Sequence, residues 1–202
     1  MIDYFVALLP ALFLGFMSIV LVAQGGDDRQ KTLGTLGGAF LFSALATPFI
    51  DVHWTTKTLL ISFLSGLILG FGQYLQILCL KVLGVSRTMP LTTAGQIIFM
   101  CLGGIILFGE MNHGLALVFA LSSIALLTLG VVFISKTEKT QEAAAENVDW
   151  KRGTILLVIS TACLVAYLLI VQGFGLDGRS VILPQSVGYF LVGLIATIPA
   201  LS

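Results

Sequence analysis

Residues Ile97 to Leu107 read Ile-Ile-Phe-Met-Cys-Leu-Gly-Gly-Ile-Ile-Leu, an apolar run without alternation. A strand of a membrane β-barrel would alternate apolar and polar residues over about ten positions. A helix that crosses the hydrocarbon layer needs about 20 mostly apolar residues, and this run lies inside such a stretch. The run therefore indicates a membrane-spanning helix.

The composition of the whole chain agrees with a membrane protein. Of the 202 residues, 57% are hydrophobic and 10% are charged, whereas soluble domains carry about 25% charged residues. Ten basic residues balance ten acidic ones, which excludes a nucleic-acid-binding protein with its basic excess. The three cysteines stand alone without a CxxC pair. We therefore expect no disulfide framework, metal site or cofactor.

Seven apolar stretches of spanning length follow one another, and nearly all charged residues lie between them. We expect spans at about 4–23, 33–50, 58–80, 88–108, 114–135, 154–173 and 181–201. The first stretch lacks the basic start and the cleavage site of a signal peptide, so we interpret it as a retained span. The predicted fold is an all-α bundle that crosses the cell membrane several times.

The basic residues are divided unequally between alternate loops. The 24–32 loop, the 79–87 loop and the 136–152 segment hold eight Lys and Arg residues, and the other loops hold two. Basic loops tend to stay in the cytoplasm. We therefore predict that the N-terminus is outside and that the 136–152 segment is cytoplasmic.

The chain also resembles itself at an offset of 150 residues. Residues 27–47 match residues 177–197 at eight of 21 positions, including the Asp-x-Arg pairs that begin at Asp27 and Asp177. The offset carries the first two spans onto the sixth and seventh. Because five spans per repeat is an odd number, the second copy is expected to be inverted in the membrane.

Inverted repeats are typical of secondary transporters, whose substrate site lies near the midplane between the halves. We expect a first five-helix repeat over 1–135, a cytoplasmic linker over 136–153 and the start of a second, inverted repeat over 154–202. The whole fold would then have ten spans, of which this chain carries seven.

Polar side chains in the spans, all but one of them uncharged, are the candidate substrate ligands. Polar groups inside a membrane are costly and tend to be functional, and amides and hydroxyls can hydrogen-bond a sugar without carrying charge. The candidates are Gln73, Gln76, Arg87, Thr88, Thr92, Gln96 and Gln185. We expect Gln73, Gln76, Arg87, Thr88 and Gln96 to face one polar cavity between the third and fourth spans.

Each candidate also has a structural alternative. Glutamine and threonine hold membrane helices together in many proteins, and an arginine at a span end can anchor the helix at the membrane surface. Glycines such as Gly66, Gly70 and Gly72 are expected to let helices approach closely.

Carboxylates are absent from the middle of every predicted span. Glu110, at the end of the fourth span, is the nearest candidate for proton coupling, and we expect it to be an interface residue. The HExxH and GxSxG motifs of enzymes are also absent. The chain is therefore predicted not to be an enzyme.

The run Gly84-Val-Ser-Arg-Thr-Met-Pro90, followed by Thr92 and Gln96, resembles the signature stretch of the bacterial glucose/ribose porter family. These are the glucose uptake and ribose uptake proteins of the drug/metabolite transporter superfamily. Further similar segments are residues 7–13, 70–76, 108–110 and 182–185. The resemblance implies two inverted five-helix halves and inward transport of a monosaccharide such as glucose or ribose.

Transport would proceed by alternating access around a midplane site, and proton coupling is left open. Leu14 and the pair Tyr74-Leu75 depart from the family pattern, so the choice of sugar is left open too. The alternative function is export of a small metabolite or drug on the same fold.

Overall fold

The structure, a computed structural model, describes residues 27–109, 114–141 and 149–198, together with scattered positions between 9 and 25. Along residues 131–141 it describes the helical backbone and, of the side chains, that of Phe133. No strand occurs in these described ranges. The elements are α2 (Asp28–Ala46), η1 (Thr47–Phe49), α3 (Thr56–Leu83), α4 (Val85–Phe108), α5 (Gly114–Gln141), α6 (Trp150–Gly173) and α7 (Gly178–Thr197).

Five of these segments are long and apolar enough to cross a membrane, namely α2 with η1, α3, α4, α6 and α7. They coincide with the predicted spans 33–50, 58–80, 88–108, 154–173 and 181–201. The predicted span 114–135 falls in α5, whose apolar part is Gly114–Gly130. Most of the predicted first span, 4–23, lies outside the described residues. The chain is thus an all-helical, multi-pass membrane protein.

Two boundaries differ from the predicted ones for local reasons. The predicted 81–87 connection reduces to Gly84 alone, because α3 continues to Leu83 and α4 starts at Val85. Gly84 has a φ of 81°, a value that favours glycine, so the chain reverses within one residue. The last span was predicted to reach 201, but α7 ends at Thr197. A proline at position 199 disfavours the helical conformation at Ile198, which is extended.

Helices also enter the predicted 136–153 linker from both sides. Helix α5 extends to Gln141, and α6 starts at Trp150 after the N-cap Asp149, whose side chain accepts from the backbone N–H of Arg152 at 3.0 Å. Residues 142–148 lie outside the description.

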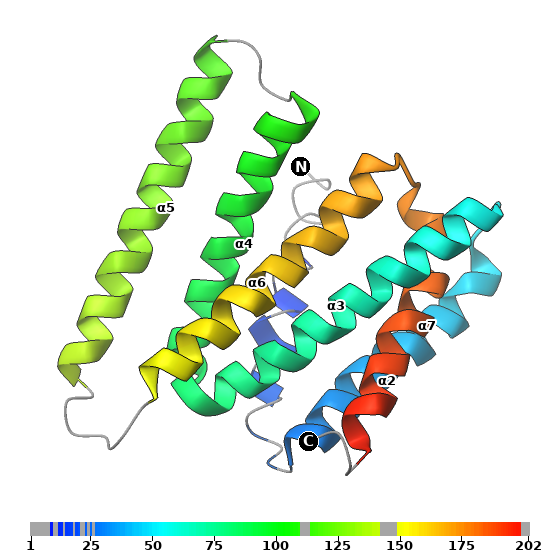
Figure 1. The fold of residues 1–202 in the computed structure, drawn as a ribbon, viewed down its shortest axis with the longest axis horizontal. Coiled ribbons are helices and arrows are strands. Elements are labelled where there is room, and N and C mark those ends of the chain that lie inside the picture. Colours follow the sequence, from blue (N-terminus) through cyan, green and yellow to red (C-terminus); the bar gives the residue numbers. More distant parts are fainter. Residues whose placement is uncertain are drawn as a thin grey trace.

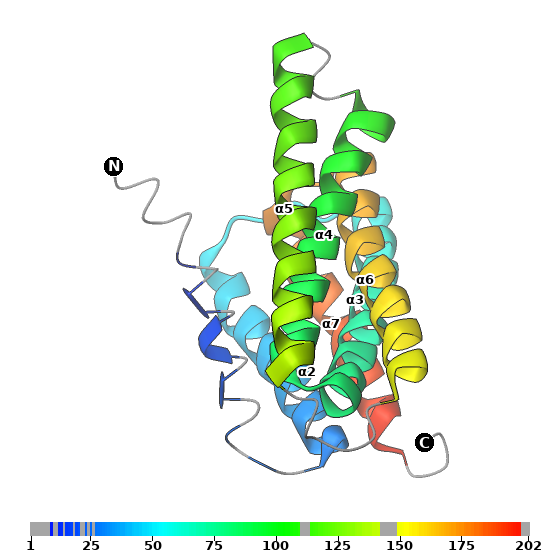
Figure 2. The same ribbon diagram turned by 90° about the vertical axis from the view of Figure 1, so that its left-hand side faces the viewer.

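Helix α3 lies at the centre of the bundle, with α6 on one side and α7 on the other (Figure 1). Helix α2 packs against α7, α4 packs against α6, and α5 packs against α4 at the edge of the bundle. Figure 2 looks onto α5, which stands in front of the other helices. The two helices that pack most extensively against α3 thus come from the second group of spans.

Glycines allow α3 to approach both neighbours closely. A Cβ atom added at Gly66 would collide with the backbone carbonyl of Gln185 in α7, and one added at Gly188 would collide with that of Phe63 in α3. At Gly72 an added Cβ would lie 2.9 Å from the Cβ of Cys163 in α6. Such close contact matters in lipid, where helices gain no hydrophobic energy by associating. The interpretation of these glycines as packing residues is confirmed.

The connections that hold most of the basic residues lie at one end of the bundle. Lys81 of α3 forms a 2.8 Å ion pair with Asp28 at the start of α2. Arg87 of α4 lies over the ring of Trp150 at the start of α6, 4.9 Å from its centroid. The three loops predicted to be cytoplasmic therefore meet at the same end.

Helices α2 and α7 are the pair that the 150-residue offset equates. Moved by 150 positions, Asp28–Ala46 would cover 178–196, and α7 covers Gly178–Thr197. Helix α7 runs parallel to α3, because Gly66 meets Gln185 and Gly70 meets Val192. Helix α2 runs antiparallel to α3, since its start lies beside the end of α3. The equated helices are therefore antiparallel, which is the direction that inverted repeats require.

Phe40 and Phe190, which the 150-residue offset equates, touch each other. Their rings are stacked with centroids 5.0 Å apart and planes 8° apart. A residue contacts its own counterpart where a two-fold axis passes between them. This contact is the one expected if a local two-fold axis relates α2 to α7.

Candidate functional site

A chain of hydrogen bonds joins α3 to α4 through three of the predicted residues. Gln76 Nε2 donates to Thr92 Oγ1 at 3.1 Å, and Thr92 Oγ1 donates to the backbone carbonyl of Thr88 at 2.7 Å. Thr88 Oγ1 donates to the backbone carbonyl of Cys79 at 3.2 Å. All three predicted side chains are buried. The structure thus brings Gln76, Thr88 and Thr92 together as a connection between helices.

Arg87, which precedes Thr88 on α4, takes part in a different contact. Its side chain is buried, and its guanidinium lies over the indole of Trp150. A cation above an aromatic face is attracted by the ring quadrupole. The contact therefore holds the start of α6 against α4, which fits the anchoring alternative for this arginine.

Gln185 lies apart from these residues, in a groove between α2, α3 and α7. Its Nε2 donates to Ser65 Oγ of α3 at 3.1 Å. The groove has a volume of about 270 Å³ and contains amide, hydroxyl and phenol groups. Its lining residues are Ala39, Ser43, Leu69, Ile182, Gln185, Ser186 and Tyr189.

One face of α3 connects the groove with the hydrogen-bonded residues. Leu69, Gln73 and Gln76 stand at positions i, i+4 and i+7 of the helix, so they share a face. Leu69 lines the groove, and Gln76 bonds to Thr92, so Gln73 lies between the two. Gln96 follows Thr92 by four positions and continues the same side of α4. We call Gln185, Gln73, Gln76, Thr92 and Gln96 the polar track.

Sequence reasoning missed Ser43, Ser65 and Tyr189. The useful signal for Ser65 was its spacing, because Ser62 and Ser65 stand three apart in the otherwise apolar stretch 59–72 of α3, and both are fully buried. Tyr189 and Ser43 carry no such signal, since only the packing of α2 against α7 brings them to the groove.

The polar track offers hydrogen-bond donors and acceptors and no charge. No Asp or Glu occurs between residues 52 and 109 or after residue 177. Within the described ranges, no group of three His, Cys, Asp or Glu residues could hold a metal ion. Glu110, the predicted coupling candidate, lies outside the described residues. The arrangement suits a neutral ligand rich in hydroxyl groups.

We expect Thr92→Val to lower the free energy of unfolding by about 1–3 kcal/mol, because the buried amide of Gln76 loses its partner. Thr93→Val is the matched control, since Thr93 is the exposed neighbour on the same helix. Denaturant titration of the protein in detergent, followed by circular dichroism, measures both variants. Equal losses in the two variants would contradict the role assigned to this hydrogen bond.

Comparison with known proteins identifies relatives along nearly the whole chain. A family model described as "Sugar transport protein" matches residues 5–201. "Probable glucose uptake protein GlcU" of Bacillus cereus is 34% identical over 197 residues, which are 98% of this chain and 69% of the relative. "Glucose uptake protein GlcU" of Bacillus subtilis is 31% identical over 195 residues, 96% of this chain and 68% of the relative.

A relative from Listeria innocua, whose name describes a sugar uptake protein without specifying the sugar, is 36% identical over 192 residues. The match covers 95% of this chain and 66% of the relative. The chain therefore spans about two thirds of the length of the curated relatives it matches. No solved structure matches it.

Proposed function

Because the chain belongs to the family of sugar transport proteins, we propose that it takes up a monosaccharide across the cell membrane, with glucose as the first candidate. The match over residues 5–201 carries this proposal, and the names of the relatives favour glucose over ribose. An uncharged polar track is the chemistry that a neutral sugar needs. The protein acts as a transporter rather than as an enzyme.

The polar track is the proposed path of the sugar. Gln185 and the hydroxyls of the groove bind the sugar in the half of the membrane where α3 and α7 begin. Gln73 and Gln96, both half-buried, form hydrogen bonds with the hydroxyl groups of the sugar further along the polar track. Gln76, Thr88 and Thr92 hold the walls of the path together, and Arg87 closes its end beside Trp150.

Alternating access is the proposed mode of movement. The first repeat (1–135) and the second (from 154) rock against each other, joined by the 136–153 segment, and expose the polar track to one side at a time. The stacked pair Phe40 and Phe190 lies where the two repeats meet, so the rings roll on each other during this motion.

Uptake measurements test the function, its direction and its coupling. Cells that lack other glucose carriers are expected to gain uptake of labelled glucose when they produce the full-length protein, and labelled ribose tests the second sugar. In vesicles, accumulation with and without an imposed pH gradient is compared for the unchanged protein and Glu110→Gln. We expect the substitution to leave both exchange and accumulation intact.

Each contrary result has a distinct meaning. Accumulation lost only in Glu110→Gln would make Glu110 the proton carrier. Absence of uptake together with efflux from preloaded vesicles would favour the alternative function, export of a small metabolite or drug.

The proposed orientation places the shared basic end in the cytoplasm. A cysteine introduced at Ala144, in the 136–152 segment, is expected to react with a membrane-impermeant reagent in opened cells and not in intact ones. Labelling of the protein without this cysteine, under the same conditions, is the background. Strong labelling of Ala144→Cys in intact cells would reverse the orientation.

A further inference from the structure

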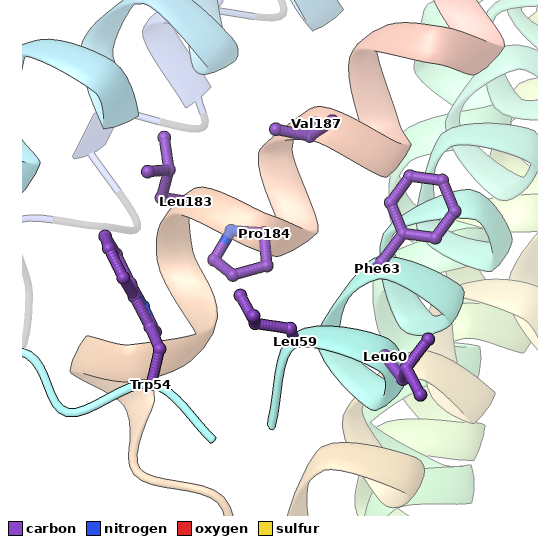
Figure 3. Close-up of a pocket in the computed structure, with 7 residues that line it drawn as sticks. All are labelled: Trp54, Leu59, Leu60, Phe63, Leu183, Pro184 and Val187. Atoms are coloured by element: carbon purple, nitrogen blue, oxygen red, sulfur yellow. The ribbon is translucent and has the colours of Figure 1, made fainter. Parts of the chain in front are cut away.

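A second groove lies on the outer side of α3 and α7, at the end where these helices begin (Figure 3). Its volume is about 380 Å³, which is within the usual range for small-ligand sites. In Figure 3, Pro184 and Leu59 lie between Trp54 on one side and Phe63 on the other. The complete lining is Trp54, Leu59, Leu60, Phe63, Leu183, Pro184 and Val187.

The groove runs from the membrane boundary into the hydrocarbon layer. Leu59 and Leu60 lie in the first turns of α3, and Val187 lies nine positions after the start of α7, which is about 14 Å at 1.5 Å per residue. Polar residues, including Asp51 and Lys57, mark the boundary just before α3 enters the apolar layer. Trp54 stands at this level, where an indole prefers to lie.

A positive charge stands on α7 one turn before the residues that line the groove. Arg179 precedes Leu183 by four positions, so it lies on the same face of α7 one turn nearer the boundary. It is exposed. A guanidinium pairs well with phosphate oxygens. An apolar groove in the hydrocarbon layer thus lies next to a cation at headgroup depth.

We propose that this groove binds one phospholipid, with an acyl chain against Trp54, Pro184 and Val187 and with its phosphate on Arg179. An apolar groove at this depth takes up an acyl chain, and the positive charge of Arg179 favours an anionic headgroup. Residues 182, 185, 186 and 189 face the polar groove on the opposite side of α7. The bound lipid thus supports the helix that carries Gln185.

Tryptophan fluorescence tests the proposal, because the chain contains only Trp54 and Trp150. In the Trp150→Phe variant, Trp54 is the reporter. Subtracting the emission of the Trp54→Phe variant from that of the unchanged protein gives the emission of Trp54 a second time, independently. In liposomes of phosphatidylglycerol with brominated acyl chains, we expect Trp54 to lose most of its emission. Brominated phosphatidylcholine at the same mole fraction should quench it less.

Two substitutions separate the groove from the surrounding bulk lipid. Val187→Phe fills the groove and is expected to reduce the quenching of Trp54, whereas Val158→Phe, at an exposed position of α6, is expected to leave it unchanged. Arg179→Gln is expected to remove the difference between the two headgroups. Unquenched Trp54 would mean that protein covers the groove, and quenching unaffected by Val187→Phe would mean contact with bulk lipid only; either result overturns the proposal.

Discussion

The Gln185→Leu variant is expected to take up sugar at least about tenfold more slowly than the unchanged protein, which corresponds to about 1.4 kcal/mol. Leucine occupies a similar space but leaves hydroxyl groups of the sugar without a partner in a groove that offers few others. The initial rate of labelled-glucose uptake, divided by the amount of protein in the membrane, measures this loss.

Two controls separate sugar binding from helix packing. Ser65→Ala removes the hydrogen bond between α3 and Gln185 without removing the amide, and Gln172→Leu makes the same substitution at an exposed position of α6. Both are expected to keep uptake within about twofold, or about 0.4 kcal/mol. If Ser65→Ala is as slow as Gln185→Leu, Gln185 acts through packing and not through the sugar.

The Gly66→Val variant is expected to lower the melting temperature by roughly 5–10 °C, because overpacking costs about 1–3 kcal/mol. Any side chain at Gly66 meets the backbone of Gln185, which cannot move without shifting α7 as a whole. Thermal unfolding in detergent, followed by size-exclusion chromatography with fluorescence detection, measures the change.

Gly130→Val is the matched control for this substitution. A Cβ atom added at Gly130 meets nothing within 4 Å, and both glycines lie within helices, so the change in helix propensity is the same. We expect a shift several times smaller for Gly130→Val. Similar shifts in both variants would show that the contact between α3 and α7 is not as close as described.

The spanning helices could be predicted because the hydrocarbon layer fixes their length and polarity. Hydropathy does not fix their ends, which depend on local backbone chemistry. Gly84 reverses the chain by itself, and its neighbours Lys81 and Arg87 therefore lie within helices rather than in a loop. The division of basic residues between alternate loops predicts that three loops lie on the same side of the membrane. The contacts of Lys81 with Asp28 and of Arg87 with Trp150 place these loops at the same end of the bundle.

The candidate site was predictable only where its partners are close in sequence. Gln76 and Thr92 are 16 residues apart on helices joined by a single residue, so their meeting follows from a simple hairpin. Gln185 and Ser65 are 120 residues apart. Their contact depends on the close approach of α7 to Gly66, and no local pattern encodes that distance.

For the proposed rocking of the two halves, the contact of Phe40 with Phe190 bears on which of the two tilts the protein prefers at rest. A contact that maps onto itself under a two-fold axis favours neither tilt, because the axis converts one tilt into the other. The preference must come from positions where the halves differ. Beside this contact, Thr35 and Ala39 in α2 correspond to Gln185 and Tyr189 in α7. In the proposed mechanism, the side chains that differ between α2 and α7, rather than the backbone that they share, therefore decide from which side the sugar first gains access.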